Sequence, residues 1–431
     1  MKKKMVSSPT SEGLIYDTKL SSVGPAYATE PELVFEPSNL DLAMKLHYLR
    51  GIYYFERQAF EGLSILAIKE PMFEWLNKYP VTSGRFRRAE SGRAYIKCND
   101  CGVRFVEAKC EKSLDEWLEM RDASLEKLLV NNQNIGPELG FSPLIFIQLT
   151  KFKCGGVAMG LSWAHVLGDA FSAAEFLNML GRVVAGQDLG RPFDLAQTLT
   201  KSNICNDPPK VADDPTAVKR VEPVGDNWLT PTKSKLEDFS FDVTPTQLGH
   251  LQSKLGPKFG PFETISTIIW KCIAKMRGQD SEPNVVTICK KSEVENKIYG
   301  MLGNTQVVSV VKADFPVVDA EPSVVASLMK DEAFDMREKI NEAMERENGV
   351  VDYVIYGANL TFVNLEEAKF YDFEYRGHKP VRVSYRVDGV GDQGAVLVLP
   401  GPDGGRVVVA ILPEEEIVGL KEELKREGLI A

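Results

Sequence analysis

The sequence predicts an α/β protein made of two similar domains, each a mixed sheet with helices, and three observations support this. The chain has 431 residues, which is enough for two domains that each bury a core. Short β-type runs alternate with amphipathic helical patterns in both halves. A polar stretch without periodicity separates the halves, and six prolines interrupt it: Pro192, Pro208, Pro209, Pro215, Pro223 and Pro231. We therefore expect a first domain at 1–195, a crossover linker at 196–236 and a second domain at 237–431.

The elements of the first domain follow from local patterns. Residues 45–56 are rich in aromatic and β-forming side chains, which favours a core strand. Apolar residues from Leu63 to Leu76 recur at helical spacing, and Tyr79-Pro80 ends that helix because the residue before a proline avoids the helical conformation. The remaining expectations are strands at residues 19–23, 94–97 and 103–108 and a short acidic helix at 114–121.

Residues 148–180 carry the main candidate for a functional motif. Two apolar runs, at 144–149 and 157–163, flank Phe152-Lys153-Cys154-Gly155-Gly156, whose glycines can supply the positive φ that a hairpin loop requires. The chain then reaches His165, after which apolar residues recur at helical spacing: Ala173, Phe176, Leu177, Leu180 and Val184. A histidine at a strand end, just before a helix, is well placed to present a catalytic side chain to a cleft.

The spacing His165-x-x-x-Asp169 leaves two interpretations open. In a chain with four histidines, chance produces this spacing on the order of one time in four, so the motif alone is a weak signal. His165 is therefore either a candidate general base or a satisfied structural histidine. Asp169 stands where a helix N-cap belongs, and capping explains an aspartate there without any chemistry. We assign Asp169 a structural role even if His165 is catalytic.

The second domain is expected to open with a strand at residues 238–243. Thr244-Pro245 then supplies the cap and the first position of a helix, and residues 262–276 are apolar on most sides, as in a buried helix. Charges at i, i+4 spacing predict one long solvated helix over residues 317–347. Further strands are expected at 285–289, 357–363, 395–399 and 406–412, the last two forming a hairpin, and a terminal helix is expected to start at Pro413.

Composition argues against several classes of function. The formal net charge of −10 argues against nucleic acid as the main partner. No apolar run approaches the ~18 residues of a membrane span, and the basic N-terminus lacks the apolar region of a secretory signal. Seven cysteines without framework spacing fit reduced thiols in the cytosol. Cys98-x-x-Cys101 has no second pair, so we expect no metal and no tightly bound cofactor.

The hairpin and the histidine motif resemble the plant BAHD acyltransferase family, whose members carry a similar F-x-C-G-G hairpin followed by H-x-x-x-D. The resemblance covers nearly the whole chain, and it implies two chloramphenicol-acetyltransferase-like domains with an interdomain channel. In that family the histidine takes the proton from an acceptor hydroxyl or amine, which then attacks the thioester carbonyl of an acyl-CoA. The resemblance thus makes His165 the candidate base near the middle of the channel, Asp169 its support, and acyl-CoA the natural ligand.

One departure from the family pattern concerns the support of the motif. Gly303-Asn304 keep a turn that resembles the family's, within Tyr299-Gly300-Met301-Leu302-Gly303-Asn304. The family arginine that pairs with the motif aspartate is absent, and Lys290 is the nearest replacement. A lysine cannot reproduce a bidentate fork with Asp169, so we expect the motif to be less rigid here.

A second departure concerns the family signature D-F-G-W-G, which precedes Lys-Pro and is thought to shape the domain junction and the CoA channel. Aligned on Lys379-Pro380, this chain reads Glu374-Tyr375-Arg376-Gly377-His378. A carboxylate remains at the first position, but Arg376 replaces a glycine and cannot adopt glycine-only backbone conformations without cost. His378 is a second candidate base that fits a surface histidine better, and His47 and His250 are expected to be structural or solvated.

A subgroup of the BAHD-like family keeps H-x-x-x-D and lacks D-F-G-W-G, namely the Eceriferum/Glossy type of plant wax proteins. The stretches that resemble this subgroup are 42–48, 152–156, 161–165, 356–365 and 389–392. The resemblance implies a role in very-long-chain fatty acid elongation for cuticular wax, beside the condensing enzyme (ketoacyl-CoA synthase) of the endoplasmic reticulum. A protein partner would then hold this otherwise cytoplasmic, monomeric chain at the cytosolic face of that membrane.

The sequence therefore leaves three hypotheses for the function. The first is an elongase accessory protein without established acyl transfer. The second is an active acyl-CoA acyltransferase with His165 as general base, acting on a hydroxyl or amine acceptor. The third is a binding module that holds a long acyl chain in the channel without turning it over. The altered signature favours the first function by family analogy, and it makes the surface around Tyr375 and Arg376 our expected partner contact.

Overall fold

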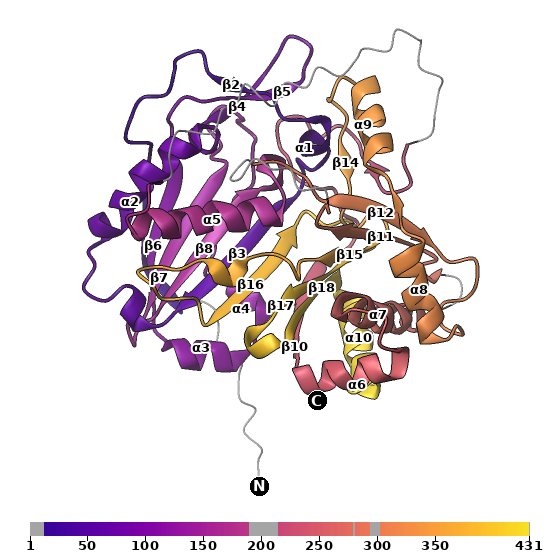
Figure 1. Ribbon diagram of the computed structural model, residues 1–431. Helices are drawn as coiled ribbons and strands as arrows, with labels where there is room; N and C mark the ends of the chain where they lie inside the picture. Colours follow the sequence, from indigo (N-terminus) through magenta and orange to yellow (C-terminus); the bar gives the residue numbers. More distant parts are fainter. Residues whose placement is uncertain (1–12, 189–213, 279–280, 294–301, 431) are drawn as a thin grey trace.

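The computed structural model describes residues 13–188, 214–278, 281–293 and 302–430 (Figure 1). Two large sheets with helices packed on them dominate these residues, and two small sheets complete the fold. Three predicted features lie outside the described residues: the basic N-terminus, residues 196–213 of the crossover and residues 299–301 of the turn. Among the described helices, none combines the length and apolar character needed to cross a bilayer.

The first sheet has six strands, in the spatial order β1 (Ile15–Val23), β6 (Val103–Cys110), β7 (Ile145–Phe152), β8 (Val157–Ala164), β3 (Tyr48–Phe55) and β16 (Arg382–Asp388). Neighbouring strands are antiparallel except β6 and β7, so the sheet is mixed as predicted. Helices α2 (Ile65–Lys78) and α5 (Ala170–Val184) lie on one face (Figure 1). The short helices α3 (Leu114–Met120) and α4 (Ala123–Glu126) lie on the other.

The hairpin between β7 and β8 forms where the glycines predict it. The backbone N–H of Phe152 donates to the carbonyl of Gly156 and that of Gly155 donates to the carbonyl of Phe152, each at 2.9 Å. Gly155 has a φ of 91°, which a residue with a side chain rarely adopts. All eight residues of β8 are buried because helices cover both faces of the sheet. The hairpin thus fixes the direction in which β8 delivers the chain to His165.

The second sheet has seven strands, in the order β10 (Leu236–Val243), β18 (Arg406–Pro413), β17 (Ala395–Pro400), β15 (Leu360–Asn364), β11 (Val285–Lys290), β12 (Val307–Lys312) and β13 (Phe334–Asp335). One face carries α6 (Pro245–Leu255), α7 (Pro261–Arg277), α8 (Pro322–Asp331) and α10 (Glu414–Arg426). As predicted, Thr244 caps α6, and Gln247 completes a capping box with it. The small sheets are β2 (Val34–Phe35) with β5 (Ala94–Lys97) and β4 (Arg85–Arg88), and β14 (Tyr353–Val354) with β9 (Lys219–Arg220).

Strand β16 belongs to the first sheet although it comes from the C-terminal half of the chain. It pairs with β3 along its whole length, from Arg382 opposite Tyr54 to Asp388 opposite Tyr48. Its buried side chain Tyr385 also makes a hydrogen bond of 3.0 Å with Tyr53. The division of the chain at residues 195 and 236 stays a prediction. β16 comes from the predicted second domain, 237–431, but it completes the sheet of the predicted first domain.

The single long helix predicted over residues 317–347 is wrong. The structure has two helices there, α8 and α9 (Arg337–Arg346), with β13 between them. Phe334 and Asp335 leave the helical path because they pair with Val310 and Ser309 of β12. Charges at helical spacing occur in both helices, so the charge pattern alone could not locate the interruption.

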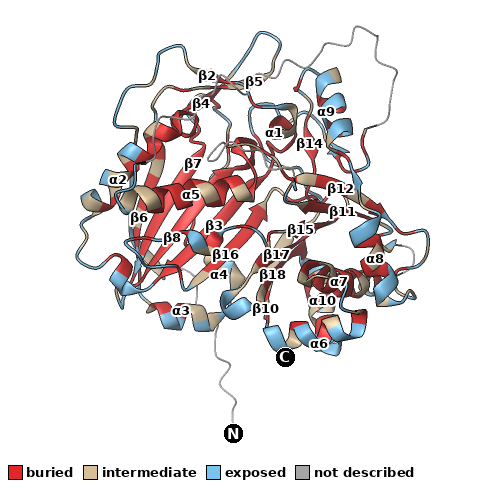
Figure 2. Ribbon diagram, viewed as in Figure 1, coloured by how far each residue is buried: buried red, intermediate tan, exposed pale blue. Residues whose placement is uncertain are grey.

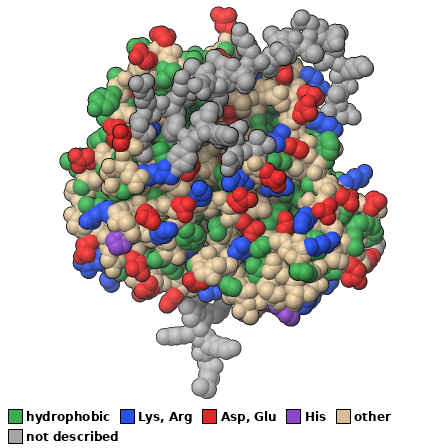
Figure 3. Space-filling model, viewed as in Figure 1, with side chains coloured by type: hydrophobic (Ala, Val, Ile, Leu, Met, Phe, Trp, Pro, Cys, Tyr) green, Lys and Arg blue, Asp and Glu red, His purple; other side chains and the backbone are tan. Residues whose placement is uncertain are grey.

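The largest hydrophobic cluster runs through both halves of the molecule. It joins α2, α5 and the first sheet to one face of the second sheet, through residues such as Phe176, Tyr385 and Leu397. A second cluster lies between the other face of the second sheet and its helices. Figure 2 shows buried strands in both sheets and exposed outer faces on the helices. On the face shown in Figure 3, acidic and basic side chains are interspersed.

Candidate functional site

His165 lies at the junction between β8 and α5. A single 3₁₀ turn, His165–Leu167, follows β8, and Gly168 and Asp169 lead into α5. Gly168 has a φ of 149°, and an added Cβ would lie 2.8 Å from the backbone nitrogen of Gly303. A glycine is therefore required here, because the segment that begins at Gly303 packs directly against this turn.

Asp169 connects this turn to the segment 303–306. One carboxylate oxygen accepts hydrogen bonds from the backbone N–H groups of Phe171 (3.1 Å) and Ser172 (3.0 Å), which makes Asp169 the N-cap of α5. The other accepts from the backbone N–H groups of Thr305 (2.8 Å) and Gln306 (2.9 Å) and from the Thr305 hydroxyl (3.1 Å). Burial raises the pKa of Asp169, and these hydrogen bonds oppose that effect.

The expectation of a less rigid motif stays a prediction, but the structure shows how Asp169 is held without the family arginine. None of the hydrogen bonds that the described residues give to Asp169 comes from a lysine or arginine, and Lys290 does not replace the family arginine. Backbone amides hold both carboxylate oxygens instead. Both oxygens of Asp169 therefore have donors although no cation of the described residues pairs with them.

The ring of His165 is fully buried and hydrogen-bonded. Its Nε2 lies 2.9 Å from the hydroxyl of Tyr356, in the segment between β14 and β15. Its backbone N–H donates to the carbonyl of His47 at 3.1 Å, and its carbonyl accepts from the Asn304 side chain at 2.8 Å. Burial lowers the pKa of His165 to about 4, against smaller opposing effects of its own backbone, Asn304 and Asp41. The ring is therefore neutral at neutral pH.

The hydroxyl of Tyr356 is held on two sides. Besides His165, it lies 2.9 Å from Nε2 and 3.0 Å from Oε1 of Gln306. It can donate to the histidine while the glutamine donates to it, or accept from the histidine while it donates to the glutamine, so Nε2 of His165 is paired in either tautomer. Nδ1 of His165 is buried and has no hydrogen-bond partner among the described residues. Burial raises the pKa of Tyr356 well above its ordinary value, which keeps the phenol protonated. The hydroxyl thus occupies the position at Nε2 where an acceptor hydroxyl would have to lie.

A second buried histidine stands beside the first. The His47 and His165 ring centres are 6.3 Å apart. Nε2 of His47 accepts from the backbone N–H groups of Ile355 (3.0 Å) and Tyr356 (3.3 Å), so it fixes the segment that carries the tyrosine. Burial, and then the neighbouring His165, lower the pKa of His47 to about 3. Asn304 is anchored in turn, since its backbone and side-chain nitrogens each lie 2.8 Å from one carboxylate oxygen of Asp41.

Sequence reasoning missed most of this network. His47 was expected to be structural or solvated, and the structure makes it structural. Asn304 could have been found from the turn that resembles the family's, and Tyr356 from the stretch 356–365 that resembles the subgroup. No local signal distinguishes Gln306 from other glutamines, because its partner lies fifty positions along the chain.

Residues 374–378 form a separate tight turn that packs against α5 and against Phe60 and Glu61. Tyr375 and His378 exchange two backbone hydrogen bonds, of 2.9 and 3.1 Å, around Arg376 (φ 53°) and Gly377 (φ 78°), which is the geometry of a type I′ hairpin turn. The Tyr375 ring is buried and stacks on that of Phe60, with ring centres 4.2 Å apart. Glu374, Arg376 and His378 are exposed, as expected for a surface histidine at 378. Phe60 covers Tyr375, so this side chain cannot contact a partner, and our prediction of a partner contact at Tyr375 is wrong.

The turn gives a stability prediction. Arg376 sits in the left-handed conformation that asparagine tolerates better than arginine, so Arg376→Asn should raise the free energy of unfolding by about 0.5–1 kcal/mol. Gly377→Ala, at the next position of the same turn, should lower it by about 1 kcal/mol. Urea unfolding of the two variants measures both changes. A destabilised Arg376→Asn variant would show that the hydrogen bond from Arg376 to the carbonyl of Glu61 outweighs the backbone strain.

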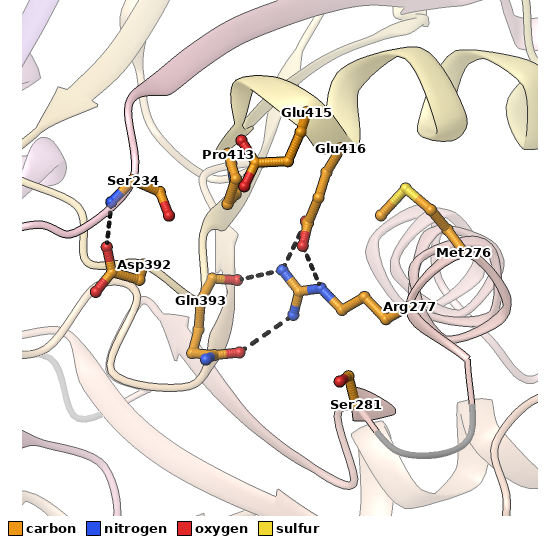
Figure 4. A pocket seen from close by; sticks show the side chains of 9 residues that line it. All are labelled: Ser234, Met276, Arg277, Ser281, Asp392, Gln393, Pro413, Glu415 and Glu416. Carbon is orange, nitrogen blue, oxygen red and sulfur yellow. Dashed lines mark hydrogen bonds and ion pairs between the residues drawn. The ribbon is translucent and has the colours of Figure 1, made fainter.

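A polar hollow of about 600 Å³ lies between α7, α10 and the segment before β17. Figure 4 shows the side chains that line it. Arg277 forms two hydrogen bonds with the Glu416 carboxylate, at 3.0 and 2.8 Å, and donates to the carbonyl of Gln393 at 3.0 Å. Asp392 accepts from the backbone of Ser234 at 3.1 Å. These polar groups pair with one another and tie the elements together, so we assign the hollow a structural role. Within the described residues, no three His, Cys, Asp or Glu side chains are grouped so that they could hold a metal ion.

A family model described as the transferase family matches residues 18–427, which is nearly the full length of the chain. The chain belongs to the transferase family. It is the family identified above as the BAHD acyltransferases. Among curated relatives of this transferase-family chain, Protein ECERIFERUM 26 of Arabidopsis thaliana is 41% identical over 97% of both chains. Protein ECERIFERUM 2 of the same plant is 35% identical over 95% of this chain and 98% of its own. Hydroxycinnamoyltransferase 1 of Oryza sativa subsp. japonica is 26% identical over 91% and 95%.

Solved structures agree with the fold of this transferase-family member. Vinorine synthase superposes with a TM-score of 0.68 at 17% identity and covers 96% of this chain and 98% of its own. TRI101 of F. graminearum, in complex with coenzyme A and deoxynivalenol, gives a TM-score of 0.68 at 14% identity over 90% and 97%. At these identities the comparisons establish the fold alone. The predicted fold of two chloramphenicol-acetyltransferase-like domains is confirmed.

The geometry at His165 allows the ring to accept a proton, but the Tyr356 hydroxyl lies where an acceptor substrate would have to bind. A neutral His165 is in the protonation state that a general base needs. Its Nε2, however, is in contact with a protein hydroxyl and is fully buried. A substrate hydroxyl could reach the nitrogen only if Tyr356 moved away, which would also break its contact with Gln306.

Proposed function

We propose that the chain is an accessory protein of very-long-chain fatty acid elongation for cuticular wax, which acts with the condensing enzyme of the endoplasmic reticulum to extend product length. The relatives named ECERIFERUM support a wax-associated role, since they are the most similar curated proteins reported above and extend over almost the whole chain. A protein partner would hold the chain at the cytosolic face of that membrane.

The observation that carries the non-catalytic part of this proposal is the contact between His165 Nε2 and the Tyr356 hydroxyl. The two atoms are 2.9 Å apart, neither side chain is exposed, and Gln306 holds the hydroxyl from its other side. A histidine that serves as general base must have a reactive nitrogen within reach of the substrate proton. Here a protein hydroxyl lies at Nε2, and Nδ1 is buried away from the surface, so neither nitrogen is within reach of a substrate. The altered sequence at residues 374–378 agrees with this, because it departs from the family signature D-F-G-W-G.

The alternative is an active acyltransferase that moves an acyl group from CoA to a hydroxyl or amine. The hydroxycinnamoyltransferase relatives favour it, as does the coenzyme A held by the structurally similar TRI101. In this case Tyr356 must leave His165 when the acceptor binds. Acyl-CoA would be a substrate in the alternative and a ligand in the accessory role, and neither role requires a tightly bound cofactor.

The test is fatty acid elongation in a host that expresses a plant condensing enzyme, with and without this chain. We expect longer products when the chain is present, because an accessory protein changes the length at which elongation stops. The host with the chain but without the condensing enzyme is the control and should show unchanged products. Identical product lengths with and without the chain would contradict the accessory role.

A further inference from the structure

A groove separate from the His165 network opens on the first sheet. It has a volume of about 790 Å³ and lies between the start of α2, the strands β1, β6 and β7, and the β7–β8 hairpin. Small-molecule sites commonly have volumes of about 300–1,000 Å³. His165, Tyr356 and Gln306 do not line the groove, and none of the hydrogen bonds described for these three side chains involves a lining residue. Its occupant would therefore be bound independently of the motif.

The inner part of the groove is apolar. Its lining includes Phe60, Leu63, Ile65, Ile68, Leu149 and Val157. Ile68 and Val157 are almost fully buried, while Leu63 and Ile65 are partly exposed along the groove. Burying such side chains under an apolar ligand is favourable in proportion to the area removed from water. The floor thus fits a hydrocarbon chain.

The rim of the groove is basic, in contrast to the rest of the chain. Five of its side chains are cationic (Lys19, Arg57, Lys109, Lys151 and Lys153) and three are anionic (Asp17, Glu61 and Glu107), which gives a net charge of +2 in a chain of net charge −10. All three carboxylates already have cationic partners: Asp17 pairs with Lys109 at 2.8 Å, Glu61 with Arg57 at 2.5 Å and Glu107 with Lys69 at 3.0 Å.

Two lysines of the rim remain without such partners. Among the described residues, neither Lys151 nor Lys153 forms an ion pair with a carboxylate. Lys151 lies directly across from Lys109 in the pairing of β6 with β7, and like charges in that position repel each other. An anion bound between the rim lysines would relieve this repulsion and form charge-assisted hydrogen bonds.

The altered turn supports one wall of this groove. Phe60, which lines the groove, is stacked from behind by Tyr375 with ring centres 4.2 Å apart. Arg376 donates to the carbonyl of Glu61, the next lining residue, at 3.2 Å. The residues in which this chain departs from the family signature therefore fix the position of the groove wall.

We infer that the groove binds an amphiphile made of one hydrocarbon chain and an anionic head group, with the chain on the apolar floor and the head at Lys151 and Lys153. The apolar lining favours a hydrocarbon chain, and the two lysines without carboxylate partners favour an anionic head group over a neutral or cationic one. The site lies apart from His165 and is a binding site rather than a place of reaction.

Cys154 offers a direct probe of the groove. Its thiol is free, exposed and part of the lining, whereas Cys101 is a free and exposed thiol outside the groove. The experiment measures the rate at which iodoacetamide alkylates each cysteine, by mass spectrometry of the peptides, while palmitate is titrated. Palmitate should slow alkylation of Cys154 by about tenfold or more at saturation and leave Cys101 unchanged. Monopalmitoylglycerol, with a neutral head, and inorganic phosphate, without a chain, should protect neither.

Charge reversal tests the role of the rim. The double variant Lys151→Glu/Lys153→Glu should raise the palmitate concentration for half-protection by about tenfold or more, since it removes both charge-assisted contacts. The matched control is Lys254→Glu on α6, an exposed lysine away from the groove, which should bind as the wild type does. All lysines in this test are exposed, so the variants should fold, and their thermal unfolding checks this. Equal protection by monopalmitoylglycerol, unchanged binding by the double variant, or no protection by palmitate would each overturn the inference.

Discussion

Asp169→Ala is expected to lower the free energy of unfolding by about 3–5 kcal/mol. The change removes the cap of α5, which costs about 1 kcal/mol. It also leaves two backbone N–H groups without an acceptor, at about 1 kcal/mol for the half-buried Thr305 and about 1–3 kcal/mol for the buried Gln306. Because the carboxylate joins α5 to the segment that carries Asn304 and Gln306, the loss should also loosen the surroundings of His165. Urea unfolding followed by circular dichroism measures the change.

Thr244→Ala is the matched control for that prediction. Thr244 caps α6 in the same way, but it is exposed and ties no distant segment to its helix. Its loss should cost about 1 kcal/mol, the ordinary price of a cap. If Asp169→Ala cost no more than Thr244→Ala, the hydrogen bonds to Thr305 and Gln306 would not stabilise the fold, and our account of how Asp169 holds the turn would be wrong.

Acidification should destabilise the protein through two buried histidines. His165 and His47 have pKa values lowered to about 4 and about 3, while an unfolded chain binds the proton near pH 6.5. Lowered pKa values mean that this stability is fully present above pH 6.5 and is lost as the pH falls, because the unfolded state then binds more protons. At pH 5 each histidine should account for a loss of about 2 kcal/mol, and the pair for about 4 kcal/mol.

The measurement is the free energy of unfolding at pH 7 and at pH 5, for the wild type and for His47→Gln/His165→Gln. The double variant should lose about 4 kcal/mol less than the wild type between the two pH values. The comparison is needed because burial raises the pKa of carboxylates such as Asp169 and Glu126, which act in the opposite direction in both proteins. His250→Gln/His378→Gln, at exposed positions, is the control and should follow the wild type. Equal losses in all three proteins would show that the buried rings do not govern the acid response.

The parts of the molecule that local patterns encode could be predicted from the sequence. Gly155 permits the turn between β7 and β8, and Asp169 caps the helix that follows, so the hairpin, the turn and α5 were expected where they occur. The same holds for Thr244 and Pro245 at the start of α6. In each case the deciding interaction joins residues only a few positions apart, and residue type reports such interactions directly.

The parts that depend on distant contacts could not be predicted. β16 joins the first sheet by pairing with β3, whose residues lie more than three hundred positions away. The sequence of residues 382–388 contains no signal that identifies β3 as the pairing partner. Tyr356 reaches His165 from the other half of the chain, and the side-chain pattern of its segment does not reveal that its hydroxyl fills the site. The break between α8 and α9 likewise follows from pairing with β12 rather than from its own sequence.

The motif His165-x-x-x-Asp169 could serve either acyl transfer or the accessory role, and the two roles place different demands on His165. In both, Asp169 fixes the turn that carries His165, and His165 is neutral. In an acyltransferase the ring nitrogen must take a proton from the acceptor, and removal of such a base typically costs about 10²–10⁴-fold in rate. In the accessory role the histidine and Tyr356 hold segments from the two halves together, so its removal lowers stability and leaves the biological effect in place.

The most direct test is therefore fatty acid elongation in a host that expresses a plant condensing enzyme together with either the wild type or His165→Ala. The thermal unfolding and the abundance of the variant are checked in parallel, so that a loss of folded protein is not read as a loss of chemistry. The account predicts that both proteins lengthen the products equally. If His165→Ala abolished the lengthening while it stayed folded and as abundant as the wild type, His165 would act as a base, and acyl transfer would replace the accessory role.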